Sequence, residues 1–266
     1  MFRLTITVCG MLAICLNETA VSSAEKSAYK LPKNPKAVVI SFDWAGGFTP
    51  PRKSNAPVLS ILRDGTVNMP DRFGLSKDVT GKISQRELQE LLAFAIKTNK
   101  FFEYDPAKVK KKIEIESKKR PFIPRIADAP SSVIFIQIAG KSHKVSHYAL
   151  AFAASQFKTI KELQQLYAIE KRLRRLMDVT RLGGPTGVKA MLTLANAELK
   201  KKYPKVKPLT MEDLQSTGID RNGSKRVSFH RSGKTATGKP DGTFVNVFIQ
   251  MQEEGNPKVT VRAKLK

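Results

Sequence analysis

Hydrophobic and polar positions along the chain follow two different periods, which together predict a mixture of strands and helices. Short apolar or alternating runs predict strands at 37–44, 58–62, 66–69, 132–139, 142–150, 244–251 and 259–265. Turn residues at 63–65, 140–141 and 222–223 predict hairpins. Apolar residues repeated every three or four positions predict three main helices, from Ser84 to near Asn99, over 159–178, and from Pro185 to about Tyr203.

The order of these elements predicts the fold class. The helices sit among hairpins without a sustained strand–helix–strand rhythm, and no repeat at a solenoid period is present. We therefore expect an α+β protein in which antiparallel sheets, built from hairpins, pack against three main helices. The Gly-Gly-Pro sequence at 183–185 ends one helix and starts the next. Two modules are expected, 37–178 and 179–266. Polar and apolar residues alternate over 259–265, so one face of this strand should meet water.

The amino terminus carries the pattern of a secretory signal peptide. An apolar run over 4–16 follows Arg3, and the small residues at 22–24 form a cleavage site. We expect residues 1–24 to be removed near Ala24 and the protein to be exported to the periplasm or secreted. The polar segment 25–36, with two prolines and four lysines, is predicted to be a disordered lead.

Both cysteines, Cys9 and Cys15, lie within this leader. The mature chain would then hold no thiol, which excludes disulfides, thiolate metal sites and a cysteine nucleophile. No apolar run reaches 18 residues, so no transmembrane segment is expected.

The charge balance is the strongest indication of function. The chain has 47 Lys and Arg against 23 Asp and Glu, a formal net charge of +24. A field of this sign attracts an acidic polysaccharide or an anionic surface. Sequence-specific nucleic-acid binding is not expected, because the chain is exported and has no DNA-reading motif. The alternative is that the charge serves only solubility. A dense basic cluster supplies candidate binding residues: Lys110, Lys111, Lys112, Lys118, Lys119 and Arg120.

A loop after the first strand supplies a second group of candidates. It combines the only tryptophan, Trp44, with Phe48 and Arg52 in a segment rich in Gly and Pro. An aromatic ring and a guanidinium on a loop can form a binding surface. The competing interpretation, which we favour, is that the two aromatic rings fasten the loop to the core.

The sequence holds no catalytic or metal-binding motif, and no cofactor or metal is expected. His143 and His147 lie four apart in a predicted strand, about 13 Å from each other by strand rise, too far to ligate one ion together. We therefore predict a non-catalytic module that binds an anionic polymer of the envelope or the surroundings. One alternative is an exported hydrolase, which His143 or His147 beside Asp128 in a deep pocket would favour. Another is a protein-interaction or inhibitor module that offers a sheet edge or an apolar groove.

The stretch from Val38 to about Asp178 resembles a bacterial domain family of unknown function found in exported proteins. The resemblance rests on an Asp-Gly-Thr-Val hairpin at 64–67, Gly81, a Ser-x-x-Glu-Leu helix at 84–88, Phe-Phe at 101–102, Asp-x-Pro at 128–130 and a Gly-Lys hairpin at 140–141. It implies an α+β fold and export, and no activity. The family often carries a Cys-Gly-x-Cys-Pro element after the first strand. Residues 45–50 hold no cysteine, so no redox or metal role is implied here.

Overall fold

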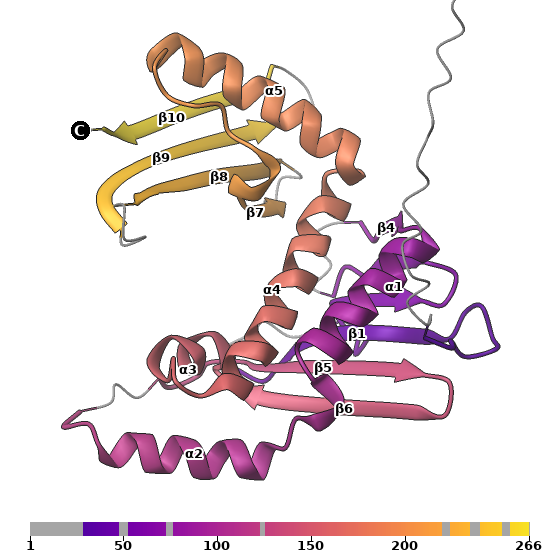
Figure 1. Ribbon diagram of the computed structural model, residues 1–266. Coiled ribbons are helices and arrows are strands. Elements are labelled where there is room, and N and C mark those ends of the chain that lie inside the picture. Colours follow the sequence, from indigo (N-terminus) through magenta and orange to yellow (C-terminus); the bar gives the residue numbers. More distant parts are fainter. Residues whose placement is uncertain are drawn as a thin grey trace, which may run out of the picture.

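A computed structural model describes residues 29–47, 53–72, 77–122, 126–219, 224–234, 240–251 and 256–265 of the chain. It confirms the α+β prediction, because each of two antiparallel sheets packs against helices. The long helix α4 (Lys161–Arg181) packs along most of its length on the first part and leads at its C-terminal end into the second (Figure 1). The signal-peptide pattern lies outside the described residues. Within the described residues, no helix is both long and apolar enough to cross a membrane.

The first module is built on a six-stranded sheet in the order β4-β3-β2-β1-β5-β6. Ile40 and Phe42 of β1 lie opposite Ile136 and Ile134 of β5 on one face of the sheet. All four are fully buried in one core with apolar residues of the helices that cover this face (Figure 1). The strands are β1 (Val38–Ala45), β2 (Leu59–Leu62), β3 (Thr66–Met69), β4 (Val79–Lys82), β5 (Ser131–Ile138) and β6 (Lys141–Tyr148).

The helices of the first module begin where local capping favours them. Ser84 and Glu87 form the predicted capping box of α1 (Gln85–Ala93), which continues into one π-helical turn, Phe94–Thr98. After a short 3₁₀ turn (Phe101–Glu103), Asp105 caps α2 (Pro106–Lys118).

Three elements, α2, β4 and α3 (Leu150–Gln156), are not among the helices and strands that the sequence predicts. The basic segment that forms α2 suggests no more than a helical turn leading into a loop, because Val109 is the one residue that this helix buries. β4 is a four-residue, largely polar edge strand, so it carries little apolar pattern. α3 follows β6 directly and has no side-chain cap. In the sequence, its apolar residues therefore cannot be distinguished from a continuation of the strand that forms β6.

Residues 29–36 belong to the segment expected to be a disordered lead, yet they contact the first module. The backbone of Tyr29 exchanges two hydrogen bonds with the side chain of Gln89 on α1. Lys30 accepts a hydrogen bond from the backbone of Ala139, and Leu31 packs against the core. An apolar residue on either side of Lys30 explains this docking. Residues 25–28 lie outside the described part.

The second module packs α5 (Gly184–Lys202) against a four-stranded sheet. Gly183, at a φ of 84°, reverses the chain between α4 and α5, as the Gly-Gly-Pro sequence predicts. Val188, Ala195 and Leu199 of α5 are buried in a core separate from that of the first module. The strands lie in the order β10-β9-β8-β7, with β7 (Leu214–Ile219), β8 (Lys225–Lys234), β9 (Pro240–Met251) and β10 (Lys258–Lys264).

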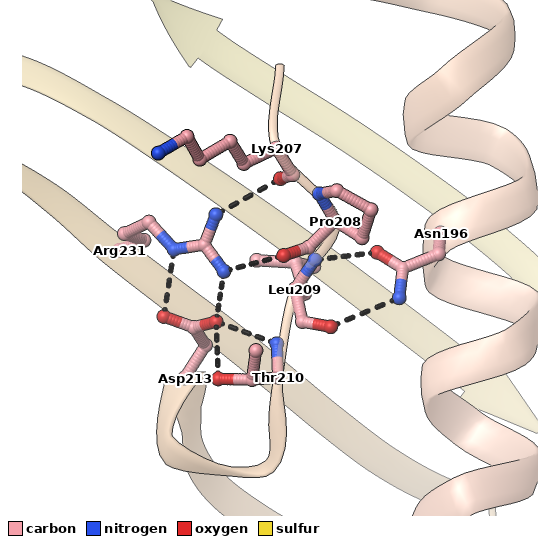
Figure 2. Close-up of polar contacts among 7 residues, drawn as sticks. All are labelled: Asn196, Lys207, Pro208, Leu209, Thr210, Asp213 and Arg231. Carbon is pink, nitrogen blue, oxygen red and sulfur yellow. Dashed lines mark hydrogen bonds and ion pairs between the residues drawn. The ribbon is translucent and has the colours of Figure 1, made fainter.

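A polar network fastens the segment between α5 and β7 to the sheet (Figure 2). The guanidinium of Arg231 on β8 donates to both carboxylate oxygens of Asp213, with its Nε 3.0 Å from Oδ1, and to the carbonyls of Lys207 and Pro208. Asn196 of α5 hydrogen-bonds both backbone groups of Leu209. Burial raises the pKa of Asp213, but bonds from Arg231 and Thr210 outweigh it, and the pKa lies below its usual value. The side chains of Arg231 and Asn196 thus supply hydrogen-bond partners for backbone groups that no neighbouring strand pairs with.

Candidate functional site

The second sheet has one apolar face and one polar face. Val227 and Phe229 of β8, like Val247 and Ile249 of β9, are buried in the core that they share with α5. Alternate residues point the other way. We call this second side the open face. Its described members are Ser216, Gly218, Arg226, Ser228, His230, Ser232, Phe244, Asn246, Phe248, Gln250, Lys258, Thr260, Arg262 and Lys264.

Strand register gathers the residues of the open face into rows across the sheet. One row joins Arg226, Gln250 and Lys258, and its neighbour joins Ser228, Phe248 and Thr260. Residues in such rows lie about 5 Å apart, so side chains from three strands can touch one ligand.

Cations and an aromatic ring dominate the open face. Four exposed cations lie on it, while none of its described members is acidic, although the chain has 23 Asp and Glu. Phe248 lies in the middle of its row and remains 45% exposed. A large apolar side chain held open among cations is typical of a surface that stacks on part of a polymer and attracts its charge.

The open face is hollowed and internally hydrogen-bonded. A depression of about 430 Å³ is lined by Arg226, Phe248, Gln250, Lys258 and Thr260, among others. Hydroxyls of Ser216 and Ser228 are bonded at 2.7 Å, and the His230 ring is bonded to Asn246 and Ser232. These bonds hold polar groups in place without removing the cations.

The predicted basic cluster lies on α2, at the other end of the molecule from the open face (Figure 1). Lys110, Lys111 and Lys118 are exposed, and within the described residues no ion pair engages them. The remaining three are engaged. Lys112 pairs with Glu162 at 2.5 Å, Lys119 pairs with Glu116 at 2.6 Å, and Arg120 lies 5.0 Å from the ring centre of Phe157. Three of the six predicted cations therefore have a described partner, and the other three, all on α2, have no ion pair within the described residues.

Of the three predicted loop residues, Phe48 and Arg52 lie outside the described part of the chain. Trp44 is the last residue but one of β1 and packs edge to face on Phe42, with ring centres 4.8 Å apart. Its ring is partly exposed and meets Arg174, whose guanidinium carbon is 5.9 Å from the ring centre. Trp44 therefore contacts the core and also faces a charged side chain of α4.

The histidines are dispersed. His143 bonds the carbonyl of Tyr104 at 3.2 Å and packs on Phe101, while His147 bonds the carbonyl of Tyr148 at 2.9 Å. Asp128 is exposed. Within the described residues, no three His, Cys, Asp or Glu side chains gather where they could hold a metal ion.

Comparison with known proteins finds no match to a protein-family model, to a curated protein or to a solved structure. The resemblance of 38–178 to an exported domain family stays a prediction.

Sequence reasoning missed the open face as a site. It did predict a wet side for strand 259–265, and Thr260, Arg262 and Lys264 lie on that side. The contributions of β7, β8 and β9 depend on strand order and register. Those become known only when the sheet is assembled.

Proposed function

We propose that the protein is a non-catalytic module that binds an anionic polymer, such as an acidic polysaccharide, through the open face of its second sheet. One observation carries this proposal: exposed cations of β8 and β10 flank the exposed ring of Phe248 on β9, on a hollowed surface whose described members include no carboxylate. Cations supply salt-dependent attraction, and the ring supplies contact with the body of a repeating unit.

The exposed lysines of α2 add a second, weaker contact for a long polymer. Lys110, Lys111 and Lys118 sit on one helix as exposed cations, so they attract charge at a range that salt screens. Export after cleavage near Ala24 would place both surfaces where envelope and extracellular polymers occur. The polar, cationic character of the open face favours this function over an apolar docking groove for a protein.

The test is a titration of the purified protein with labelled acidic polysaccharide over a salt series, with charge reversals at matched positions. The variant Lys258→Glu/Arg262→Glu changes two cations of the open face. The control Lys189→Glu/Lys200→Glu makes the same change in net charge on exposed positions of α5, on the other side of the sheet. We expect the first variant to lose about tenfold or more in affinity and the control about threefold or less, since tenfold is about 1.4 kcal/mol.

The variant Phe248→Ala distinguishes binding at a defined site from attraction by a diffuse charge field. Loss of the ring should cost about 1 kcal/mol of binding free energy, or roughly fivefold in affinity. The salt dependence of binding should stay unchanged, because no charge is removed. Equal losses for both charge-reversal variants, with no effect of Phe248→Ala, would show that the charge acts only as a general field. DNA and anionic vesicles titrated in parallel identify the class of polyanion preferred.

A further inference from the structure

A second hollow, of about 330 Å³, lies in the first module and shares no residue with the open face. It opens where the ends of β1 and β5 meet α3, α4 and the segment before β5. Its walls are largely apolar, including Trp44, Ile126, Leu150 and Phe152, and its polar side chains are Ser132, Glu170 and Arg174. The size and the mixture of apolar walls with a few converging polar groups are those of a small-molecule site.

Glu170, on α4, is a buried carboxyl in this wall. It is only 2% exposed, accepts a hydrogen bond from the Ser132 hydroxyl at 2.8 Å, and is also hydrogen-bonded by the indole of Trp44. An ionised carboxyl has about four acceptor positions, so two such bonds leave capacity for a ligand. Burial raises the pKa of Glu170, and the bonds from Ser132 and Trp44 and the charge of Arg174 offset that rise only in part.

Arg174 places a cation beside this carboxyl. Its Nη1 lies 3.7 Å from Oε1 of Glu170, which is longer than a hydrogen bond. The side chain is 48% exposed, and its guanidinium lies against the Trp44 ring. Within the described residues no hydrogen bond uses its five N–H donors. One wall of the hollow therefore offers a donor-rich cation next to an acceptor-rich carboxyl.

The backbone around the hollow is strained. Among the described residues, three other than glycine have a positive φ. One of them, Ala149 at 47°, lines the hollow, and a second, Asp128 at 59°, directly precedes the lining residue Ala129. Tyr148 fixes the segment 126–129 beside the hollow, because its hydroxyl donates to the carbonyl of Ile126 and accepts from the amide of Ala129. Strained backbone that its surroundings hold in place is concentrated at ligand sites.

We propose that this hollow binds a free α-amino acid with an apolar side chain. The ligand carboxylate would pair with Arg174, its ammonium with Glu170, and its side chain would lie against Ile126 and Phe152. An α-amino acid carries both charges on a single carbon, which suits two protein charges held 3.7 Å apart. A simple carboxylate would leave Glu170 without a cation from the ligand, and a simple amine would leave the donors of Arg174 unused. The zwitterion is the class that satisfies both.

Trp44 gives a direct test, because it is the only tryptophan in the chain and lines the hollow. Tryptophan fluorescence of the full protein is followed while leucine, N-acetylleucine and leucinamide are added separately. We expect a saturable change with leucine. The affinity should be at least tenfold weaker for N-acetylleucine, which lacks the ammonium, and for leucinamide, which lacks the carboxylate. These comparisons use the unmodified protein, so no variant has to fold.

Variants then assign the contacts. Arg174→Gln and Glu170→Gln should each weaken leucine binding by about tenfold or more. Arg172→Gln, which removes an exposed cation two residues away that does not line the hollow, should leave it unchanged. The proposal is wrong if leucine produces no saturable change, or if N-acetylleucine or leucinamide binds as tightly as leucine. It is also wrong if Arg172→Gln weakens binding as much as Arg174→Gln.

Discussion

Replacing Arg231 by Ala should destabilise the second module while leaving the first intact. The substitution removes both bonds to Asp213 and the donors to the Lys207 and Pro208 carbonyls (Figure 2). Hydrogen bonds to charged groups contribute about 1.5–3 kcal/mol, and breaking a fully buried pair costs about 3–5 kcal/mol. The Arg231 side chain is 29% exposed and Asp213 keeps its bonds from Thr210, so water and neighbours compensate in part. We therefore expect a loss of about 2–3 kcal/mol.

Hydrogen exchange measured by mass spectrometry can assign this loss to one module. A loss of 2–3 kcal/mol corresponds to roughly 30- to 150-fold faster exchange of the most protected amides of β8 and β9. Peptides from β1 and β5 should exchange as before, because the buried residues of the two modules form separate cores. Arg262→Ala, on an exposed position of the same sheet, is the control and should change stability by about 0.5 kcal/mol or less. The reasoning fails if exchange in β8 and β9 is unchanged, or if β1 and β5 accelerate equally.

Three further substitutions test local features. For Glu170→Gln, the urea midpoint of unfolding should be compared with that of the natural protein at pH 4 and at pH 7. The difference should favour the variant more at pH 7 than at pH 4. The pKa of Glu170 is raised in the folded protein, so its protonated form stabilises the fold. This contribution is complete below the ordinary pKa of 4.5 and is lost as the pH rises through the pKa of the folded state. Gly47→Ala should cost about 1–2 kcal/mol more than Gly46→Ala in thermal unfolding. Both residues have a positive φ, but a Cβ at Gly47 would lie 2.9 Å from the carbonyl oxygen of Asp128, whereas one at Gly46 meets nothing within 4 Å. Ser84→Ala removes the capping box of α1 and should cost about 1 kcal/mol in the same assay.

Much of the fold could be predicted because the elements carry strong local patterns. The hairpin turning at Gly140 and the junction at Gly183 follow from residues that favour a left-handed backbone. The order of strands within each sheet could not be predicted, since it depends on contacts between distant segments. β5, for example, inserts beside β1, although β1 to β4 form neighbouring pairs in chain order.

The sites were harder to predict than the fold because their residues come from several elements. Trp44 attracted attention as an aromatic residue beside a loop, but nothing in the sequence joins it to Ser132 or Glu170. Those three residues meet because β1 and β5 are paired with Trp44 opposite Ser132, and α4 crosses above that pair. Glu170 stands four residues after Leu166 and three before Leu173, so helical spacing places it on the inward face of α4, but its partners become known only when the helix is docked.

The placement of charge distinguishes a field from a site. Spread over the chain, a net charge of +24 would attract any polyanion, and we expect the exposed lysines of α2 to contribute only to this general attraction. On the open face, strand register instead fixes cations of β8 and β10 on either side of one exposed ring of β9, so that their directions as well as their sign are defined. The hollow proposed to bind an amino acid applies the same principle at short range. Glu170 and Arg174 lie one turn apart on α4, and both contact Trp44. In both places the relative position of groups, more than their number, gives the surface the capacity to select a ligand.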